Sequence, residues 1–162
     1  MFSIRPIARF ATFAVVAAVL ILAVSPAAAE VSGGLRVGFS SSPDQFLAGG
    51  QLNLDPVSSH VYIVPSGEAG FGDDAFTLSF NGDVQYRFDA DDKVRPYAGG
   101  GLTIYYFNLD NEFGGGSDTN VGVTVLGGIF FGRDSGHPMF AEAKAGLTDE
   151  VPDWKFIFGI NF

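Results

Sequence analysis

Hydrophobic and polar residues alternate strictly from Phe76 to Phe88. The even positions carry Phe, Leu, Gly, Val and Tyr, and the odd positions carry Thr, Ser, Asn, Asp, Gln and Arg. A period of two predicts an extended strand with one apolar and one polar face, because a helical period of 3.6 would scatter the aromatic residues around the axis. The run is also long enough for a tilted crossing of a bilayer's hydrocarbon core, which takes about 9–11 residues.

Similar alternating runs follow one another along the chain, separated by segments rich in Gly, Pro, Asp, Asn and Ser that favour turns. They predict eight strands at residues 34–40, 45–54, 60–71, 76–88, 94–107, 121–132, 139–147 and 154–162. Such short connections allow only antiparallel neighbours. Pro65 falls inside the third run, where it cannot donate to the ladder, so we expect a bulge or a different register there.

The two faces of the predicted strands differ in chemistry. The apolar rows contain no Asp, Glu, Lys or Arg, while the opposite rows combine charged residues with many small ones. The charged positions assigned to this polar face are Arg36, Glu68, Asp83, Arg87, Arg95, Glu142, Lys144 and Lys155.

Two architectures share this pattern. A soluble, secreted lipocalin-like barrel would enclose a ligand with its apolar row, whereas an outer-membrane barrel turns that row toward lipid. The apolar row holds more aromatic residues than an eight-stranded lumen could accommodate, and the polar row is small enough for a tight interior. Aromatic residues also gather near the strand ends, as in the girdles of membrane barrels. These are Phe39, Phe46, Phe71, Phe76 and Trp154 at one end and Tyr86, Phe88, Phe131 and Phe162 at the other.

We therefore predict an all-β protein, an eight-stranded antiparallel up-and-down transmembrane β-barrel. The soluble ligand-binding barrel is the alternative. Each large apolar side chain left in water forgoes roughly 1.5–3 kcal/mol of burial, and the apolar rows carry several such side chains per strand. Lipid would cover that surface, and closure of the sheet would pair the backbone groups, as hydrocarbon requires.

The N-terminus predicts a secretory signal peptide over residues 1–29. Arg5 and Arg9 precede an apolar run, which ends in Ala27-Ala28-Ala29. The apolar run is shorter than the ~18–20 residues of a spanning helix, which argues against a membrane anchor. The predicted cut after Ala29 leaves residues 30–162 as one barrel domain.

Charge and cysteine content narrow the function classes further. The formal net charge of −9 becomes about −11 once the two signal-peptide arginines are removed, which argues against nucleic acid as a partner. The chain has no cysteine, so we expect no disulfide framework after secretion.

Two motifs resemble the small eight-stranded outer-membrane β-barrels of the opacity type. Residues 95–101, RPYAGGG, are similar to a segment that opens a central strand in that superfamily. Residues 156–162, FIFGINF, are similar to its C-terminal signal, carried here by Phe156, Phe158, Ile160 and Phe162. The resemblance implies the outer membrane of a Gram-negative cell, contact with its lipids, and recognition of the last strand by the barrel-assembly machinery. We expect a monomer.

The inward charges are the main candidate site. Charges in a narrow lumen have to pair or stay hydrated, because an unpaired buried charge is costly. We interpret them as a structural salt-bridge plug that gives the protein a structural or surface role. A narrow, porin-like ion channel is the second alternative, with a two-charge positive excess that would favour anions. We expect Arg87 and Arg95 to anchor this network.

Other chemistry finds little support. Some barrels of this group act on lipid A through a His and a Ser near the outer leaflet, but His60 and His137 fall at the predicted periplasmic end, and Ser58-Ser59 precede His60. We therefore predict no enzyme and no catalytic residue. The acidic loop Asn108–Asn120 lacks the spacing of a calcium loop, so we expect no metal site and no cofactor.

Overall fold

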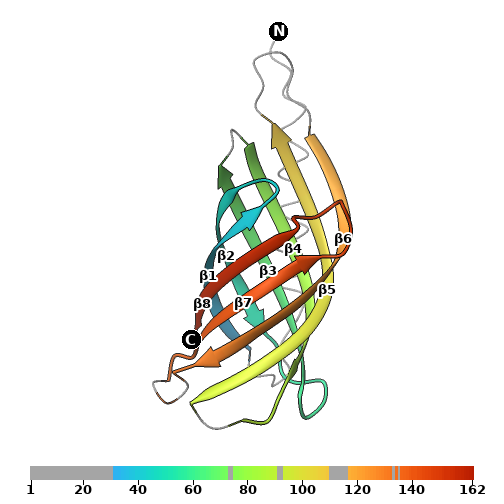
Figure 1. Cartoon of the computed structure of the whole chain (residues 1–162). Helices are drawn as coiled ribbons and strands as arrows, with labels where there is room; N and C mark the ends of the chain where they lie inside the picture. Colours follow the sequence, from blue (N-terminus) through green and yellow to red (C-terminus); the bar gives the residue numbers. More distant parts are fainter. Residues whose placement is uncertain (1–30, 73–74, 91–92, 110–116, 133, 135) are drawn as a thin grey trace. The chain divides into compact units, whose positions relative to one another are not determined.

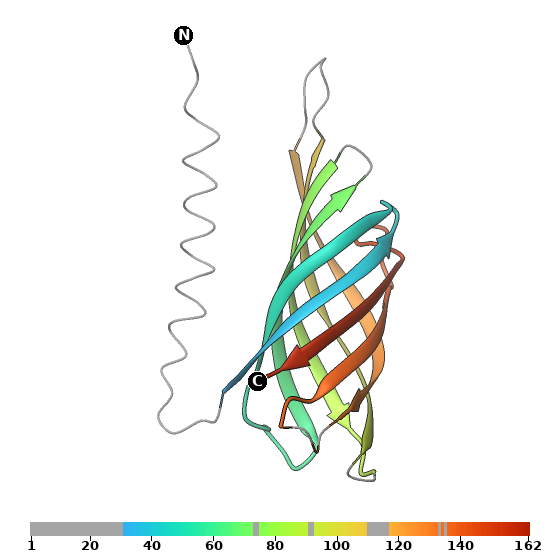
Figure 2. The ribbon, with the colours of Figure 1, turned by 90° about the vertical axis from the view of Figure 1, so that its left-hand side faces the viewer.

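The computed structural model describes residues 31–72, 75–90, 93–109, 117–132, 134 and 136–162. Its eight strands are β1 (Ser32–Ser41), β2 (Gln45–Asn53), β3 (Val61–Gly72), β4 (Ala75–Arg87), β5 (Val94–Leu109), β6 (Ser117–Phe131), β7 (Met139–Gly146) and β8 (Trp154–Asn161). Each pairs with its sequence neighbours in antiparallel fashion, and β8 closes on β1, which forms a closed barrel of tilted strands (Figures 1 and 2). The predicted eight-stranded up-and-down barrel is confirmed.

The strand boundaries differ most from the prediction in the β5–β6 hairpin. The ladder there continues to the pair Asn108–Ser117, so the connection is shorter than the predicted loop Asn108–Asn120. Ser117, Asp118 and Asn120 are polar and do not follow the apolar alternation. A hairpin that extends beyond the apolar belt can carry polar residues on both faces, so hydrophobic periodicity does not mark its end.

Pro65 does not disturb its strand in the expected way. The β3–β4 ladder runs without a bulge from Val61–Tyr86 to Gly72–Ala75, and Pro65 pairs with Gly82. The β2–β3 ladder stops at Gln51–Ser66, one residue before the proline. The expectation of a bulge or a different register is wrong, because the missing N–H affects only the ladder with β2.

Most large apolar side chains of the strands point out of the barrel, and the buried charged ones point in. Phe80 is 41% exposed and Phe158 is 59% exposed, whereas Arg36 and Lys144 are each 2% exposed. The lipocalin-like alternative requires the opposite arrangement and is wrong. An outer surface of this kind is suited to lipid, because each of these side chains would forgo roughly 1.5–3 kcal/mol in water.

Aromatic residues form rows at both ends of the outer surface. At one end, Phe39 pairs with Phe46, Phe46 with Phe71, and Phe71 with Phe76, so one row crosses four strands. At the other end, the rings of Tyr86 and Phe88 lie 5.0 Å apart. Aromatic residues at both strand ends are typical of the girdles that border the hydrocarbon region of a membrane barrel.

The predicted signal peptide, residues 1–29, lies outside the described residues. Among the residues that the structure describes, no helix is long and apolar enough to span a membrane. The barrel begins with β1 at Ser32, close to the predicted start of the mature chain at residue 30.

Candidate functional site in the barrel lumen

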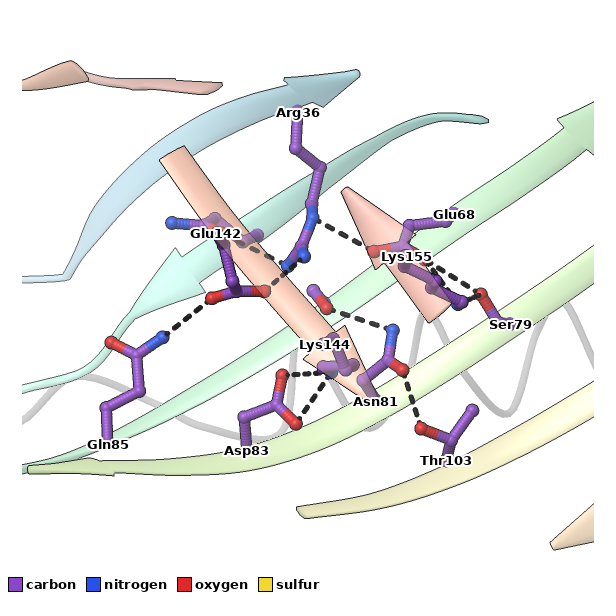
Figure 3. A network of polar contacts seen from close by, with 12 residues as sticks. Arg36, Glu68, Ser79, Asn81, Asp83, Gln85, Thr103, Glu142, Lys144 and Lys155 are labelled. Atoms are coloured by element: carbon purple, nitrogen blue, oxygen red, sulfur yellow. Dashed lines mark hydrogen bonds and ion pairs between the residues drawn. The ribbon is translucent and has the colours of Figure 1, made fainter. Parts of the chain in front are cut away.

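Arg36 lies at the centre of the polar lumen (Figure 3). It projects inward from β1, where alternation places it between the outward-facing Leu35 and Val37. Its Nε is 3.0 Å from Oε1 of Glu68, and its Nη2 donates to Oε1 of Glu142 at 3.0 Å. Arg36 therefore joins β1 to carboxylates on β3 and β7, far apart in sequence.

Two lysines extend the network toward β4 and β8. Lys144 donates to both carboxylate oxygens of Asp83, at 2.8 and 2.7 Å, and Lys155 donates to Oε2 of Glu68 at 2.7 Å. Ser79 donates to the same oxygen at 3.1 Å. The two ion pairs thus join strands that are not neighbours in the barrel: β7 with β4, and β8 with β3.

The buried charges balance. Arg36, Lys144 and Lys155 face Glu68, Asp83 and Glu142, and all six are at most 4% exposed. Three positive and three negative groups therefore sit in the middle of the lumen with no excess of either sign. The predicted two-charge positive excess does not apply to this part of the lumen.

Neutral polar groups fill the space around the ions. Gln51 accepts from Arg36 Nη1 at 3.2 Å and donates to Asn161 at 3.0 Å. Asn81 accepts from Thr103 at 2.8 Å and donates to Ser66 at 3.1 Å. Asn81 faces Ser66 and Thr103 directly in the ladders of β4 with β3 and β5, so these hydrogen bonds run along the inner wall between neighbouring strands.

The lumen also contains an apolar cluster that was not predicted from the sequence. Its members face inward from β5 to β8 and are all at most 7% exposed: Tyr97, Leu126, Phe130, Phe140 and Ile157. The rings of Tyr97 and Phe130 lie 4.8 Å apart, and those of Phe130 and Phe140 lie 6.0 Å apart. Alternation places each of them on the inner row, so the signal that could have found them is a large apolar residue among the charged and small ones.

Inner-row glycines make room for these rings. Gly128 faces the ring of Tyr97 and Gly159 faces the ring of Phe140, and a Cβ at either position would overlap ring atoms. Tyr97 also donates its hydroxyl to Oε2 of Glu142 at 3.0 Å. It therefore connects the apolar cluster to the charge network.

Arg87 lies nearer the end of the barrel than Arg36, at the last residue of β4. Its guanidinium donates to Asn53 Oδ1 at 2.8 Å and to Gln85 Oε1 at 3.2 and 3.4 Å. Its Cζ lies over the rings of Tyr62 and Phe130, 3.9 and 4.6 Å from their centroids. Gln85 in turn approaches Glu142 at 3.5 Å, which links Arg87 to the network indirectly.

Arg95 does not join the network. Its Nε donates to the carbonyl of Phe88 at 3.1 Å, and its Nη2 lies 3.9 Å from Asp89, which is 82% exposed. The structure thus brings together six of the eight predicted charged residues, connects Arg87 through an amide, and leaves Arg95 at the rim. Arg36 occupies the central position that we predicted for Arg87 and Arg95.

A cavity of about 270 Å³ lies between the network and that end of the barrel. We call it the vestibule. Its described lining residues are Ser32, Asn53, Arg87, Arg95, Phe130, Gly136, Pro138, Asn161 and Phe162. They come from the ends of the strands at which β1 begins and β8 finishes.

The histidine geometry offers no catalytic arrangement with Ser58 or Ser59. His60 Nε2 lies 2.9 Å from both carboxylate oxygens of Asp89, and its ring stacks on Tyr86 at 5.6 Å. Ser58 takes part in a backbone turn with Val61. No group of three or more potential metal-ligating residues occurs among the described residues. Most of the acidic loop that was considered for calcium binding lies outside them.

Solved structures of several outer-membrane barrels superpose on this chain. The N-terminal β-barrel domain of Pseudomonas aeruginosa OprF superposes with a TM-score of 0.71 at 16% identity, over 82% of this chain and 95% of that one. Neisserial surface protein A (NspA) gives 0.61 at 16% identity, over 81% and 92%. Ail of Yersinia pestis gives 0.55 at 11% identity, over 81% and 93%.

This chain has the fold of the small outer-membrane β-barrels. The predicted resemblance to that group is confirmed at the level of fold. No protein-family model and no curated protein matches the sequence. At these identities the likeness concerns the fold alone, so function has to be argued from the lumen and the surface of this chain.

Proposed function

We propose that the protein resides in the outer membrane of a Gram-negative cell as a closed barrel with a structural or surface role. The observation that carries this proposal is the neutral charge network around Arg36, which crosses the lumen from β1 to β3 and β7. All six charged members are buried, and amide and hydroxyl groups fill the space between them. A lumen filled in this way leaves no continuous path for solutes.

The outer surface supports contact with lipid and assembly through the last strand. Phe156, Phe158, Ile160 and Phe162 all point outward from β8 or its end and are 38–62% exposed. This row would present the C-terminal signal to the barrel-assembly machinery before the strand pairs with β1. Closure of the barrel uses both edges of the sheet, so we expect a monomer. We expect no catalytic function, because His60 contacts Asp89 and Tyr86 rather than either neighbouring serine.

Planar-bilayer recording tests the closed lumen. We expect no sustained conductance from the wild-type protein. Arg36→Met should introduce openings, because it removes the cation that joins Glu68 to Glu142 and leaves Glu142 without an ion-pair partner among the described residues. Arg95→Met removes the same charge from the rim and should behave as the wild type. Regular conductance steps from the wild-type protein would instead support the narrow channel.

Fractionation tests the location separately. The protein should require detergent for extraction and should migrate faster on a gel before boiling than after it, as a folded barrel does. Recovery in the soluble periplasmic fraction without detergent would contradict the proposal, whatever the conductance recordings show.

A further inference from the structure

The vestibule has the chemistry of an anion site. Arg87 and Arg95 both line it, and its described lining residues include no Asp or Glu. The polar side chains of Asn53, Asn161 and Ser32 also belong to lining residues, and they can donate hydrogen bonds without adding charge. The nearby network around Arg36 is neutral, so it does not supply a counter-charge to this cavity.

Arg87 is held in place before any ligand arrives. Its guanidinium lies over the rings of Tyr62 and Phe130, and Asn53 and Gln85 fix it further by hydrogen bonds. The Nε and Nη2 groups of Arg87 are donors in these bonds, so an oxyanion that binds there would take the place of the Gln85 or Asn53 oxygen and exchange a neutral acceptor for a charged one. A fixed arginine also loses less side-chain entropy on binding than a flexible one.

Arg95 adds a second positive group on the neighbouring strand. Arg87 pairs with Tyr97 in the β4–β5 ladder, so Arg95 lies two residues further along the same inward face. Its side chain is 23% exposed, and Asp89, 3.9 Å away, is itself largely in solvent. A weak, solvated ion pair of this kind can be replaced by an oxyanion at little cost.

From this arrangement we infer that the vestibule binds a small oxyanion, a carboxylate or phosphate group, with Arg87 and Arg95 as its charged ligands. The cavity, at about 270 Å³, lies just below the range of roughly 300–1,000 Å³ for drug-sized ligands, so the bound group belongs to a small solute or to the end of a larger molecule. In the proposed outer-membrane location, this end of the barrel faces the periplasm, and that orientation rests on the proposed function. The binding chemistry does not.

The first test titrates the purified, folded barrel in a non-ionic detergent. The probes are inorganic phosphate and succinate, each compared with chloride at equal ionic strength, by calorimetry and by melting temperature. We expect one of the two oxyanions, or both, to bind and to raise the melting temperature above the chloride control. Phosphate alone identifies a phosphate site, succinate alone a carboxylate site. The absence of binding by both would overturn the inference.

Variants separate a site from general charge effects. Arg95→Gln should weaken binding by about tenfold or more, because it removes a charge-assisted contact. Lys93→Gln removes one positive charge from the adjacent turn but does not line the vestibule, so it should bind as the wild type. Ser32→Trp should abolish binding by filling the cavity while leaving both arginines. Unchanged binding in Arg95→Gln and Ser32→Trp would contradict the site.

A labelling experiment places the anion in the cavity. The chain has no cysteine, so Ser32→Cys introduces a unique thiol into the vestibule lining. The oxyanion that binds should slow its reaction with a negatively charged thiol reagent, and Lys93→Cys should react at the same rate with and without that anion. Equal protection of both thiols would refute binding inside the vestibule. The result is independent of bilayer conductance, which tests the closed lumen.

Discussion

Arg36 and Arg95 are the same residue type on the same inward face, yet their surroundings differ completely. Arg36 is 2% exposed and lies between two carboxylates at 3.0 Å. Arg95 borders a cavity, and its nearest described carboxylate, 3.9 Å away, is largely solvated. The first arginine is part of the buried charge network, and the second has only a weak, solvated ion pair. The position of an arginine along the barrel axis, rather than its residue type, therefore decides whether it joins the buried network or borders the vestibule.

The largest effect should come from Arg36→Met. It leaves the buried Glu142 without its cation and Glu68 with Lys155 alone, and removal of one partner of a buried ion pair costs about 3–5 kcal/mol. Urea unfolding of the refolded barrel, followed by the fluorescence of Trp154, measures this loss. Adding Glu142→Gln restores the charge balance of the network and should recover part of the stability. No recovery would mean that Arg36 acts through packing rather than charge.

A smaller effect is expected at the junction between the charge network and the apolar cluster. Tyr97→Phe keeps the ring against Phe130 but removes the hydroxyl that donates to Glu142. Loss of a hydrogen bond to a charged acceptor should cost about 1.5–3 kcal/mol in the same unfolding measurement. Tyr86→Phe, on the outward face, serves as the control and should change stability little. Equal losses in both variants would show that the hydroxyl has no special role in the lumen.

The smallest effect should follow Arg95→Ala. Its ion pair with Asp89 lies at the solvated rim, where such pairs contribute at most about 1 kcal/mol. The unfolding free energy should therefore fall by no more than that, while the inferred oxyanion binding should weaken as in Arg95→Gln. A loss of stability comparable to that of Arg36→Met would show that Arg95 at the rim contributes as much to folding as Arg36 in the buried network.

Alternation along the sequence determined the barrel and its inside-out arrangement. Each strand repeats apolar and polar residues with a period of two. Once the apolar face of a strand is assigned to the outside, Phe80 lies outside and Asp83 inside. The ends of β5 and β6 could not be predicted in this way, because polar residues beyond the apolar belt carry no periodic signal. Pro65 was misjudged for a related reason, since the sequence does not say which of two neighbouring strands loses a hydrogen bond.

The sequence could name the inward charges, but only the closed barrel decided which of them meet. Arg36 reaches Glu142 across 106 positions, and Lys155 reaches Glu68 across 87. Those pairings depend on the register carried around all eight strands and on the level at which each side chain enters the lumen. Alternation fixes the face of a residue and leaves its height undetermined. The position along the barrel axis placed Arg36 among buried carboxylates and Arg95 beside the cavity.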